Sequence, residues 1–252
     1  MITRVKTAQE ITNMKASGQM LATVLQLLHK KIEVGMSTAE LADLAADELK
    51  RLGGEPAFLG YQGFPSVICT SINDEVVHGI PKPDKIITDG DIVGLDFGVI
   101  YRGMITDAAI TVIVGRPKQI GHIRLVEDTL RALNEGIAVV HDQVRTGDIG
   151  AAIEKSLKKR QYGIVRDLVG HGVGHNVHED PNIPNYGRPN TGPWLNSGMT
   201  IAIEPMVTLG TDQVNIAEDG WTILTADGSR SAHFEHTVLI TNDSAEILTE
   251  LK

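Results

Sequence analysis

Carboxylates interrupt apolar, β-branched runs in this chain, and its fold must bury them together. Asp96 stands in DIVGLDFGV, Glu204 in MTIAIEPM and Glu235 in SAHFEHTVLI, and we expect such runs to form buried strands. A buried carboxylate without a partner either takes up a proton or requires a positive charge nearby. Two further groups stand in distinctive patterns, Asp107 in RGMITDAAIT and His171 in GHGVGHNVHEDP. Four carboxylates and one imidazole aimed at one place predict a centre of two divalent cations.

Taken one at a time, these residues have ordinary explanations. Asp96 and Asp107 are eleven residues apart with Gly98 and Gly103 between them, which suits a hairpin, but Asp is also common in turns. A glutamate in a strand often faces solvent, and a single histidine is more often structural than a ligand. The joint occurrence of all five patterns is what favours a metal site.

Capping boxes and apolar periodicity predict four helices. The T-x-x-E and S-x-x-E patterns at 7–10 and 37–40 each indicate a helix start, and the second helix should stop at Gly53. We expect a third helix over about 120–141 and a fourth over about 148–163.

The remaining apolar runs predict strands. We expect them at AFLGYQGF, SVICTSI, DIVGLDFGVIY, AAITVIV, MTIAIEPMV, WTILTAD and SAHFEHTVLI. The order helix, helix, strands therefore occurs twice. Gly90 precedes Asp96 by six positions, just as Gly198 precedes Glu204. These shared landmarks indicate a duplicated unit with the metal site between its halves, although mixed α and β chains also show such coincidences.

The length fits one domain over 1–252, and the repeated order of elements indicates related halves at about 7–115 and 116–245. Hydrophobic residues make up 42% and aromatic residues only 4%, so the core should be mainly aliphatic. A net charge of −9 without a basic stripe argues against DNA as a partner. With Cys69 as the one cysteine, no internal disulfide can form, which fits a cytoplasmic location. No apolar run is long enough to span a membrane.

Several longer motifs together resemble those of the type I methionine aminopeptidases, a branch of the pita-bread metallopeptidases. The motifs are NDEVVHGIP, GHGVGHNVHEDP, PNYGRP, GMTIAIEPMV, DGWTILTADGSRSAHFEHT and the DFG…TD hairpin, and the likeness extends over about residues 7–241. The resemblance implies an α+β pita-bread fold of two pseudo-symmetric halves, with a central, mainly antiparallel sheet covered by helices. Only 26 positions separate His178 from Glu204, which favours type I over the type II branch with its long insertion there.

The resemblance also implies an activity and residue roles. The activity is metal-dependent removal of the initiator methionine from nascent proteins with a small second residue, through attack of a metal-bridging hydroxide on the first peptide bond. The implied ligands, with Asp96 and Glu235 each touching both ions, are Asp96, Asp107, His171, Glu204 and Glu235. Glu204 would also be the general base, while His178 would stabilise the oxyanion and His78 would contact the scissile amide nitrogen. The implied methionine pocket consists of Tyr61, Phe64, Cys69, Val177 and Trp221.

Three of the positions that depart from the family pattern bear on metal affinity or pocket size. Ala108 follows the second ligand aspartate where Thr or Ser is common, so a hydrogen bond that supports the ligand is expected to be missing. Phe97 stands where other residues are usual, and Val177 replaces a larger residue, which should widen the pocket.

Ions and partners are less closely defined by the sequence. The ligand set accepts Mn, Fe, Co or Zn. The implied partners are nascent polypeptide N-termini. Contact with the ribosome fits the role, but no residue indicates it, and we expect a monomer. Two alternatives are an Xaa-Pro peptidase and an inactive relative that acts as a binding module.

Overall fold

An antiparallel sheet of nine strands forms the centre of the computed structural model, which describes residues 3–251. Its order is β1-β4-β5-β16-β11-β8-β9, with β2 beside β4 and β17 beside β16. The strands are β1 (Glu55–Pro56), β2 (Ile68–Ile72), β4 (Ile92–Tyr101), β5 (Met104–Ile113), β8 (Gly170–Gly172), β9 (Glu179–Ile183), β11 (Thr200–Ile203), β16 (Glu235–Ile240) and β17 (Ala245–Ile247). All of their pairs are antiparallel.

Three small sheets extend this centre. In the first, β10 (Trp194–Leu195) pairs with β6 (Val144–Arg145). In the second, β12 (Met206–Thr208) lies between β15 (Ser231–His233) and β7 (Gly163–Ile164). In the third, β14 (Ile223–Thr225) lies between β13 (Val214–Ile216) and β3 (Glu75–Val77).

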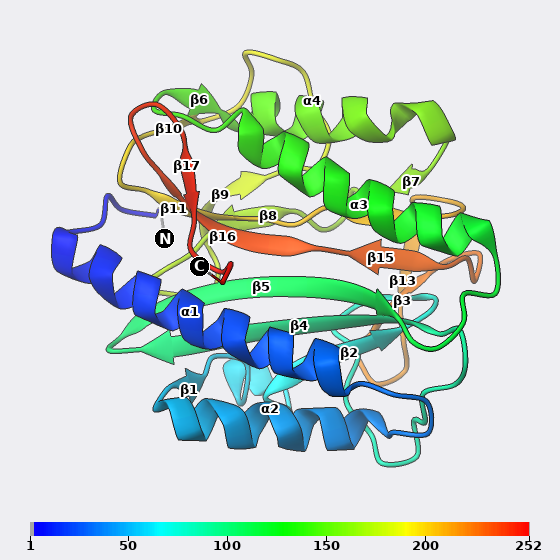
Figure 1. Ribbon diagram of the computed structural model, residues 1–252. Coiled ribbons are helices and arrows are strands. Elements are labelled where there is room, and N and C mark those ends of the chain that lie inside the picture. Colours follow the sequence, from blue (N-terminus) through cyan, green and yellow to red (C-terminus); the bar gives the residue numbers. More distant parts are fainter. Residues whose placement is uncertain (1–2, 252) are drawn as a thin grey trace.

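Four α-helices cover the central sheet in two pairs (Figure 1). They are α1 (Ala8–Lys31), α2 (Thr38–Leu52), α3 (Ile120–Ala138) and α4 (Thr146–Leu157). The first two pack on β4 and β5 around one apolar cluster, and the last two pack beside β11 and β16 around another. The predicted capping boxes at the starts of α1 and α2 are both formed. The predicted antiparallel sheet covered by helices is thus confirmed.

Strand alternation separates the core from the opposite face of the sheet. In β4, Val93, Leu95 and Phe97 are fully buried in the cluster with α1 and α2. Successive side chains of a strand point to opposite faces. Asp96 therefore points away from the helices, and the carboxylate that interrupts this apolar run leaves the helix-facing core apolar.

Two predicted strands are interrupted close to each other. MTIAIEPMV divides into β11 and β12 on either side of Glu204 and Pro205, and SAHFEHTVLI divides into β15 and β16 at Phe234. Because β11 pairs with β16 and β12 with β15, both segments pass together from the central sheet into the sheet of β15, β12 and β7. Pro205 has no N–H for a ladder, which explains the first break.

Two other predictions need correction. Residues 57–64 do not form a strand, because Gly60, Gln62 and Gly63 take φ of 82°, 49° and 92° around the 3-10 helix η1 (Tyr61–Gly63). The fourth helix ends at Leu157 instead of residue 163. It continues as the 3-10 helix η2 (Lys158–Arg160), and Gln161 then turns the chain at φ 57°.

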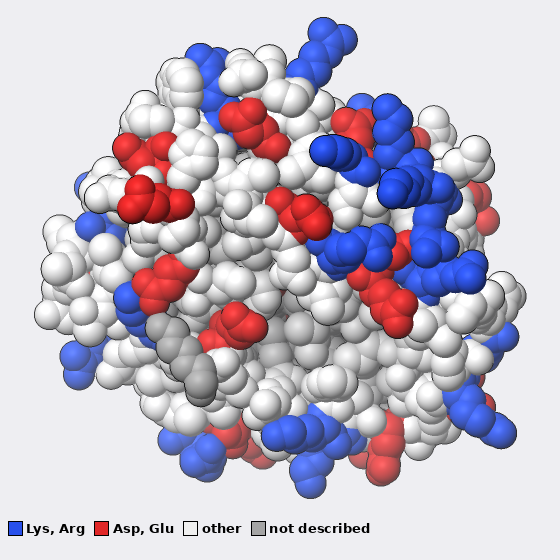
Figure 2. All heavy atoms as spheres, turned by 45° about the horizontal axis from the view of Figure 1, so that its top comes forward, with Lys and Arg blue, Asp and Glu red and all other residues white. Residues whose placement is uncertain are grey.

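The surface is of mixed charge. Figure 2 shows Lys and Arg side chains gathered on one side of a face over which Asp and Glu are otherwise spread. A hollow bordered by α3 and α4 is lined by four basic residues, Arg131, Lys155, Lys159 and Arg160. Two of them, Arg131 and Arg160, each lie 2.6 Å from Asp128, so part of this charge is neutralised. Within residues 3–251, no helix is long and apolar enough to cross a membrane.

Candidate metal centre

The register of the central sheet brings the predicted ligands to one face. Across the β4–β5 hairpin, Asp107 lies opposite Gly98, two positions from Asp96, so both aspartates point to the same side. Ala109 of β5 lies opposite Asp96 on one side and opposite Glu235 of β16 on the other. These three carboxylates, Asp96, Asp107 and Glu235, form what we call the carboxylate wall.

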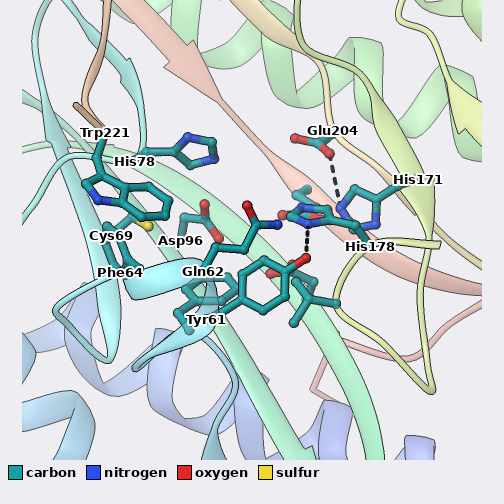
Figure 3. A pocket seen from close by; sticks show the side chains of 14 residues that line it. Tyr61, Gln62, Phe64, Cys69, His78, Asp96, His171, His178, Glu204 and Trp221 are labelled. Carbon is teal, nitrogen blue, oxygen red and sulfur yellow. Dashed lines mark hydrogen bonds and ion pairs between the residues drawn. The ribbon is translucent and has the colours of Figure 1, made fainter. Parts of the chain in front are cut away.

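A second wall is built around Glu204. Its carboxylate lies between two imidazoles, with Oε1 at 3.5 Å from Nε2 of His171 and Oε2 at 3.5 Å from Nε2 of His233. His171 sits opposite Ala202 of β11, and its ring centroid lies 4.3 Å from that of His178 (Figure 3). We call these residues, Glu204 with His171, His178 and His233, the histidine wall.

Small side chains leave room between the walls. Ala109 and Ala202 are buried in the central sheet beside the aspartates and His171. Each of these positions carries only a methyl group, while the residues opposite on the neighbouring strands carry carboxylates or an imidazole. The cavity has a volume of about 170 Å³, and all of the predicted ligands line it.

The donor atoms suit divalent cations. Among the described residues, two groups hold their ligand atoms within 4.8 Å of one another: Asp107, His171 and Glu235, and Glu204, His233 and Glu235. Buried oxygens of the carboxylate wall, one each from Asp96, Asp107 and Glu235, lack a hydrogen-bond partner. Buried polar atoms are normally paired, so these orphaned oxygens fit a site that binds cations.

The two groups of ligand atoms have one residue in common, Glu235. Asp96 belongs to neither, and the aspartate that lies with His171 and Glu235 is Asp107. Asp107 belongs to one group only, so the predicted sharing of Asp96 and Glu235 between two ions stays a prediction.

The carboxylate wall resists ionisation. Burial raises the pKa of Asp96 to about 7. Burial, and then the neighbouring carboxylates, raise the pKa values of Asp107 and Glu235 well above their ordinary range. Three buried acids lie side by side, and a bound cation would supply the positive charge that favours their ionisation.

The histidine wall has the opposite effect on its carboxylate. Burial opposes ionisation of Glu204, but the nearby imidazoles of His233 and His171 outweigh it and lower the Glu204 pKa. Glu204 is therefore an ionised carboxylate in a site where the other acids favour protonation, which is the condition that a proton acceptor needs.

Two imidazoles, those of His178 and His78, reach the cavity from loops. His178 is at the mouth, where Nδ1 lies 3.0 Å from the hydroxyl of Tyr61. Desolvation of its packed side, and then His171, lower the His178 pKa to about 4. His78 follows β3 with φ 59°, a region that few non-glycine residues adopt, and burial lowers its pKa as well. Both rings are thus neutral near neutral pH.

The other end of the cavity is apolar. Phe64 and Trp221 meet edge to face with ring centroids 5.2 Å apart, and Cys69 lies beside them opposite Asp96 in the β2–β4 pair (Figure 3). Burial, and then the nearby carboxylates, raise the Cys69 pKa, so the thiol remains neutral. This end offers rings and a sulfur atom to an apolar, polarisable group.

The three departures from the family pattern lie in different places. Ala108 and Phe97 face each other across β4 and β5 and are buried in the helix-facing core, away from the cavity. The side chain at 108 is therefore on the wrong face to support Asp107. Val177 does line the cavity, next to His178.

Residues that the motifs did not single out also belong to the site. Phe58 and Gln62 line it, and His233 contacts Glu204. His233 stands two positions before Glu235, a spacing that puts both on one face of a strand, and this was the signal available in the sequence. Phe58 and Gln62 belong to the segment that was predicted to be a strand.

Comparisons with known proteins agree with this site. The model of metallopeptidase family M24 matches residues 12–242. A methionine aminopeptidase of Mycoplasma capricolum is 44% identical over 246 residues, covering 98% of each chain. A crystal structure of a methionine aminopeptidase from Thermotoga maritima superposes with a TM-score of 0.97 at 45% identity, covering 99% of this chain and 100% of that one.

A prolidase is a more distant neighbour. The enzyme from Pyrococcus furiosus has a TM-score of 0.78 at 25% identity, and the match covers 98% of this chain but 66% of the prolidase. The fold is thus shared between the two kinds of peptidase, and the pita-bread architecture predicted from the motifs is confirmed.

Proposed function

This chain belongs to metallopeptidase family M24, and we propose that it is a methionine aminopeptidase that releases the initiator methionine of nascent polypeptides. The observation that carries this proposal is the cavity itself, in which an apolar end with rings and a thiol lies directly beside a cation-binding cluster. Identity of 44% to a methionine aminopeptidase along nearly the whole chain supports it.

The proposed ligands of two divalent ions all line the cavity. They are Asp96, Asp107, His171, Glu204 and Glu235. When bound, ions of Mn, Fe, Co or Zn supply Lewis-acid chemistry, which polarises a peptide carbonyl and acidifies water. The unpartnered oxygens of the carboxylate wall support this assignment.

The polar residues divide the remaining work. Glu204 accepts a proton from the attacking water, because its lowered pKa keeps it ionised. His178 donates from its neutral ring to the developing oxyanion, and His78 donates to or accepts from the scissile amide nitrogen. Neutral imidazoles suit both roles, since neither ring brings a full positive charge close to the ions.

The apolar residues hold the substrate. The methionine side chain packs against Tyr61, Phe64, Cys69, Val177 and Trp221, where the thioether meets aromatic rings. Peptide beyond the first bond leaves through the mouth, where Gln62 and His178 are exposed. The side chains of Gln62 and His178 at the mouth limit the second residue of the substrate to a small one.

Methionine release tests the proposal. Chelator-stripped protein is reloaded with Mn²⁺, Fe²⁺, Co²⁺ or Zn²⁺ and offered Met-Ala-Ser, Met-Leu-Ser and Ala-Pro-Ser. We expect metal-dependent cleavage of Met-Ala-Ser, with little of Met-Leu-Ser. Cleavage of Ala-Pro-Ser instead would move the chain to the Xaa-Pro peptidases, and metal binding without any cleavage would reject the peptidase activity.

We also propose that the domain consists of two related halves, about 7–115 and 116–245. Gly90 and Gly198 support this, because they have φ of 82° and 85° and each stands two residues before a central strand, β4 or β11. Each half then contributes one helix pair and two of the proposed carboxylate ligands. The proposed setting is the cytoplasm, with the protein acting as a monomer on chains that emerge from the ribosome.

A further inference from the structure

His233 is a buried imidazole that the proposed ligand set leaves without a role. It ends β15, two residues before Glu235, and is only 3% exposed. Its Nε2 lies 3.5 Å from Oε2 of Glu204, which is too long for a hydrogen bond, and this nitrogen has no hydrogen-bond partner. A buried ring nitrogen that lies near carboxylates without a hydrogen bond to them is placed as a metal ligand would be.

The position of this ring is fixed by its backbone. The hydroxyl of Thr111 donates to the carbonyl oxygen of His233 at 2.6 Å, and the N–H of His233 donates to the same hydroxyl at 3.0 Å. On the other side, His233 pairs with Met206 of β12. A side chain held from both neighbouring strands keeps its direction, which ligands of a metal centre require.

Two of the three imidazoles of the histidine wall, His171 and His233, are placed alike around Glu204. Nε2 of His171 and Nε2 of His233 each lie 3.5 Å from a different oxygen of this one carboxylate. One atom of His233 lies within 4.8 Å of ligand atoms of both Glu204 and Glu235, the same spacing that relates His171 to Asp107 and Glu235. Such distances are those between atoms that share an ion, given metal–ligand bonds of roughly 2.0–2.2 Å.

We propose that His233 is a further ligand of the metal centre, through Nε2, so that this site binds its ions with two imidazoles. The inference rests on the proposed function for the existence of the centre and adds a ligand to it. Imidazole favours Co²⁺, Zn²⁺ and Fe²⁺, while carboxylate-rich sites suit Mn²⁺. A second imidazole therefore shifts the metal preference of this chain away from Mn²⁺.

The competing role for His233 is a hydrogen bond to Glu204 alone. In that arrangement the ring donates to the carboxylate and touches no ion. A glutamine at 233 separates the two roles, because its amide N–H can still donate to Glu204 but it has no imidazole nitrogen. His236→Gln is the matched control, since its ring is bonded to Thr249 and its strand neighbour is the ligand Glu235.

Proton NMR of the Co²⁺-loaded protein counts the bound imidazoles directly. The paramagnetic ion shifts the ring N–H of each coordinated histidine far outside the normal range. We expect two such exchangeable signals in the native protein, one of which is lost in His233→Gln and both of which remain in His236→Gln. A single signal in the native protein, or two that both survive His233→Gln, would overturn the proposal. The native count needs no variant to fold.

Titration calorimetry of the stripped protein provides the second readout. Loss of a ligand should weaken Co²⁺ binding by about 100-fold, which is the upper end of the effect seen for residues that only support a ligand. The loss of Mn²⁺ affinity should be smaller. Unchanged Co²⁺ affinity in His233→Gln contradicts the proposal. Neither readout uses a peptide. Two imidazole signals without methionine release would therefore reject the proposed function and keep this inference, and release with one signal would do the reverse.

Discussion

The two walls of the cavity carry the same chemical group in opposite states. In the carboxylate wall, Asp107 and Glu235 are buried against other acids, and their pKa values rise. In the histidine wall, Glu204 is also in the cavity, but two imidazoles lower its pKa. Because burial opposes ionisation in both walls, the comparison teaches that the neighbours decide which carboxylate is ionised without a cation and can accept a proton.

The largest test exchanges one carboxylate in each wall for its amide. We expect Asp107→Asn and Glu204→Gln each to reduce methionine release by at least about 100-fold, since both disturb the ligand set. In chelator-treated protein their effects on stability should differ. A carboxyl whose pKa is raised on folding costs stability above its ordinary range, so Asp107→Asn removes that cost and raises the melting temperature. Glu204→Gln instead deprives the imidazoles of their ionised carboxylate and does not raise it.

Scanning calorimetry checks this difference. Adding Mn²⁺ should raise the melting temperature of the unaltered protein, because an ion that binds only the folded state stabilises it. The rise should be smaller in both variants. Equal shifts of Asp107→Asn and Glu204→Gln in chelator would show that the two walls do not differ in charge balance.

The second test removes a contact that supports the loop of His178 from outside the cavity. Lys6 is buried, donates to the hydroxyl of Thr3 at 2.9 Å and lies 3.6 Å from the carboxylate of Glu179. The other oxygen of Glu179 accepts from the backbone N–H groups of His175 and Asn176, both at 2.9 Å. The N-terminal segment thus anchors the loop that carries the imidazole at 178.

We expect Lys6→Met to lower the free energy of unfolding by about 2 kcal/mol, the scale of a hydrogen bond to a charged group. It should also lower kcat, because His178 loses its fixed position, while Mn²⁺ affinity remains unchanged. Urea unfolding, kinetics and calorimetry measure the three quantities. Lys15→Met, which breaks the half-exposed pair with Glu246, is the control. A loss of metal affinity equal to the loss of kcat would mean that the walls are not independent.

The third test concerns the tautomer of His178. If the Tyr61 hydroxyl donates to Nδ1, the ring proton is on Nε2 and faces the substrate. Tyr61→Phe keeps the aromatic surface and removes this donor. We expect kcat to fall about 2- to 12-fold, from 0.5–1.5 kcal/mol for one hydrogen bond, with little change in KM. Tyr186→Phe, which stacks with Arg166 away from the site, should leave kcat unchanged. A change in KM alone would indicate only a packing role.

The walls also differ in how far the sequence predicts them. Asp96 and Asp107 lie in long strands, where alternation decides the face and the spacing of eleven decides the hairpin, so their meeting is readable from the pattern. The placement of Glu235 beside them requires only that β16 pair with β5. Local rules and one pairing therefore suffice for the carboxylate wall.

The histidine wall and the cavity mouth depend on tertiary contacts that no local pattern contains. His233 stands before the break at Phe234, so a continuous strand was expected where two sheets meet. Residues 57–64 look like a strand because aromatic and small residues alternate, yet Gly60, Gln62 and Gly63 turn the chain with positive φ. Metal-ligand motifs could be recognised, but the number of imidazoles around Glu204 required the structure.

The smallest expected effect is electrostatic. It concerns Glu10, which links the first helix to His175 in the loop that carries His178. The backbone N–H of Thr7, at 2.7 Å, and then the ring of His175, at 2.8 Å, hold the pKa of Glu10 at about 2. A lowered pKa means that the ionised form stabilises the fold, so this contribution is complete above the ordinary value of 4.5 and is lost as the pH falls towards 2. Glu10→Gln should therefore cost about 1 kcal/mol, the typical effect of a helix cap, above that window and nothing below it. Urea unfolding in chelator across the window measures the difference, with the exposed Glu33→Gln as control. A cost that stays constant with pH would assign Glu10 to packing and leave the loop of His175 without this charged link to the first helix.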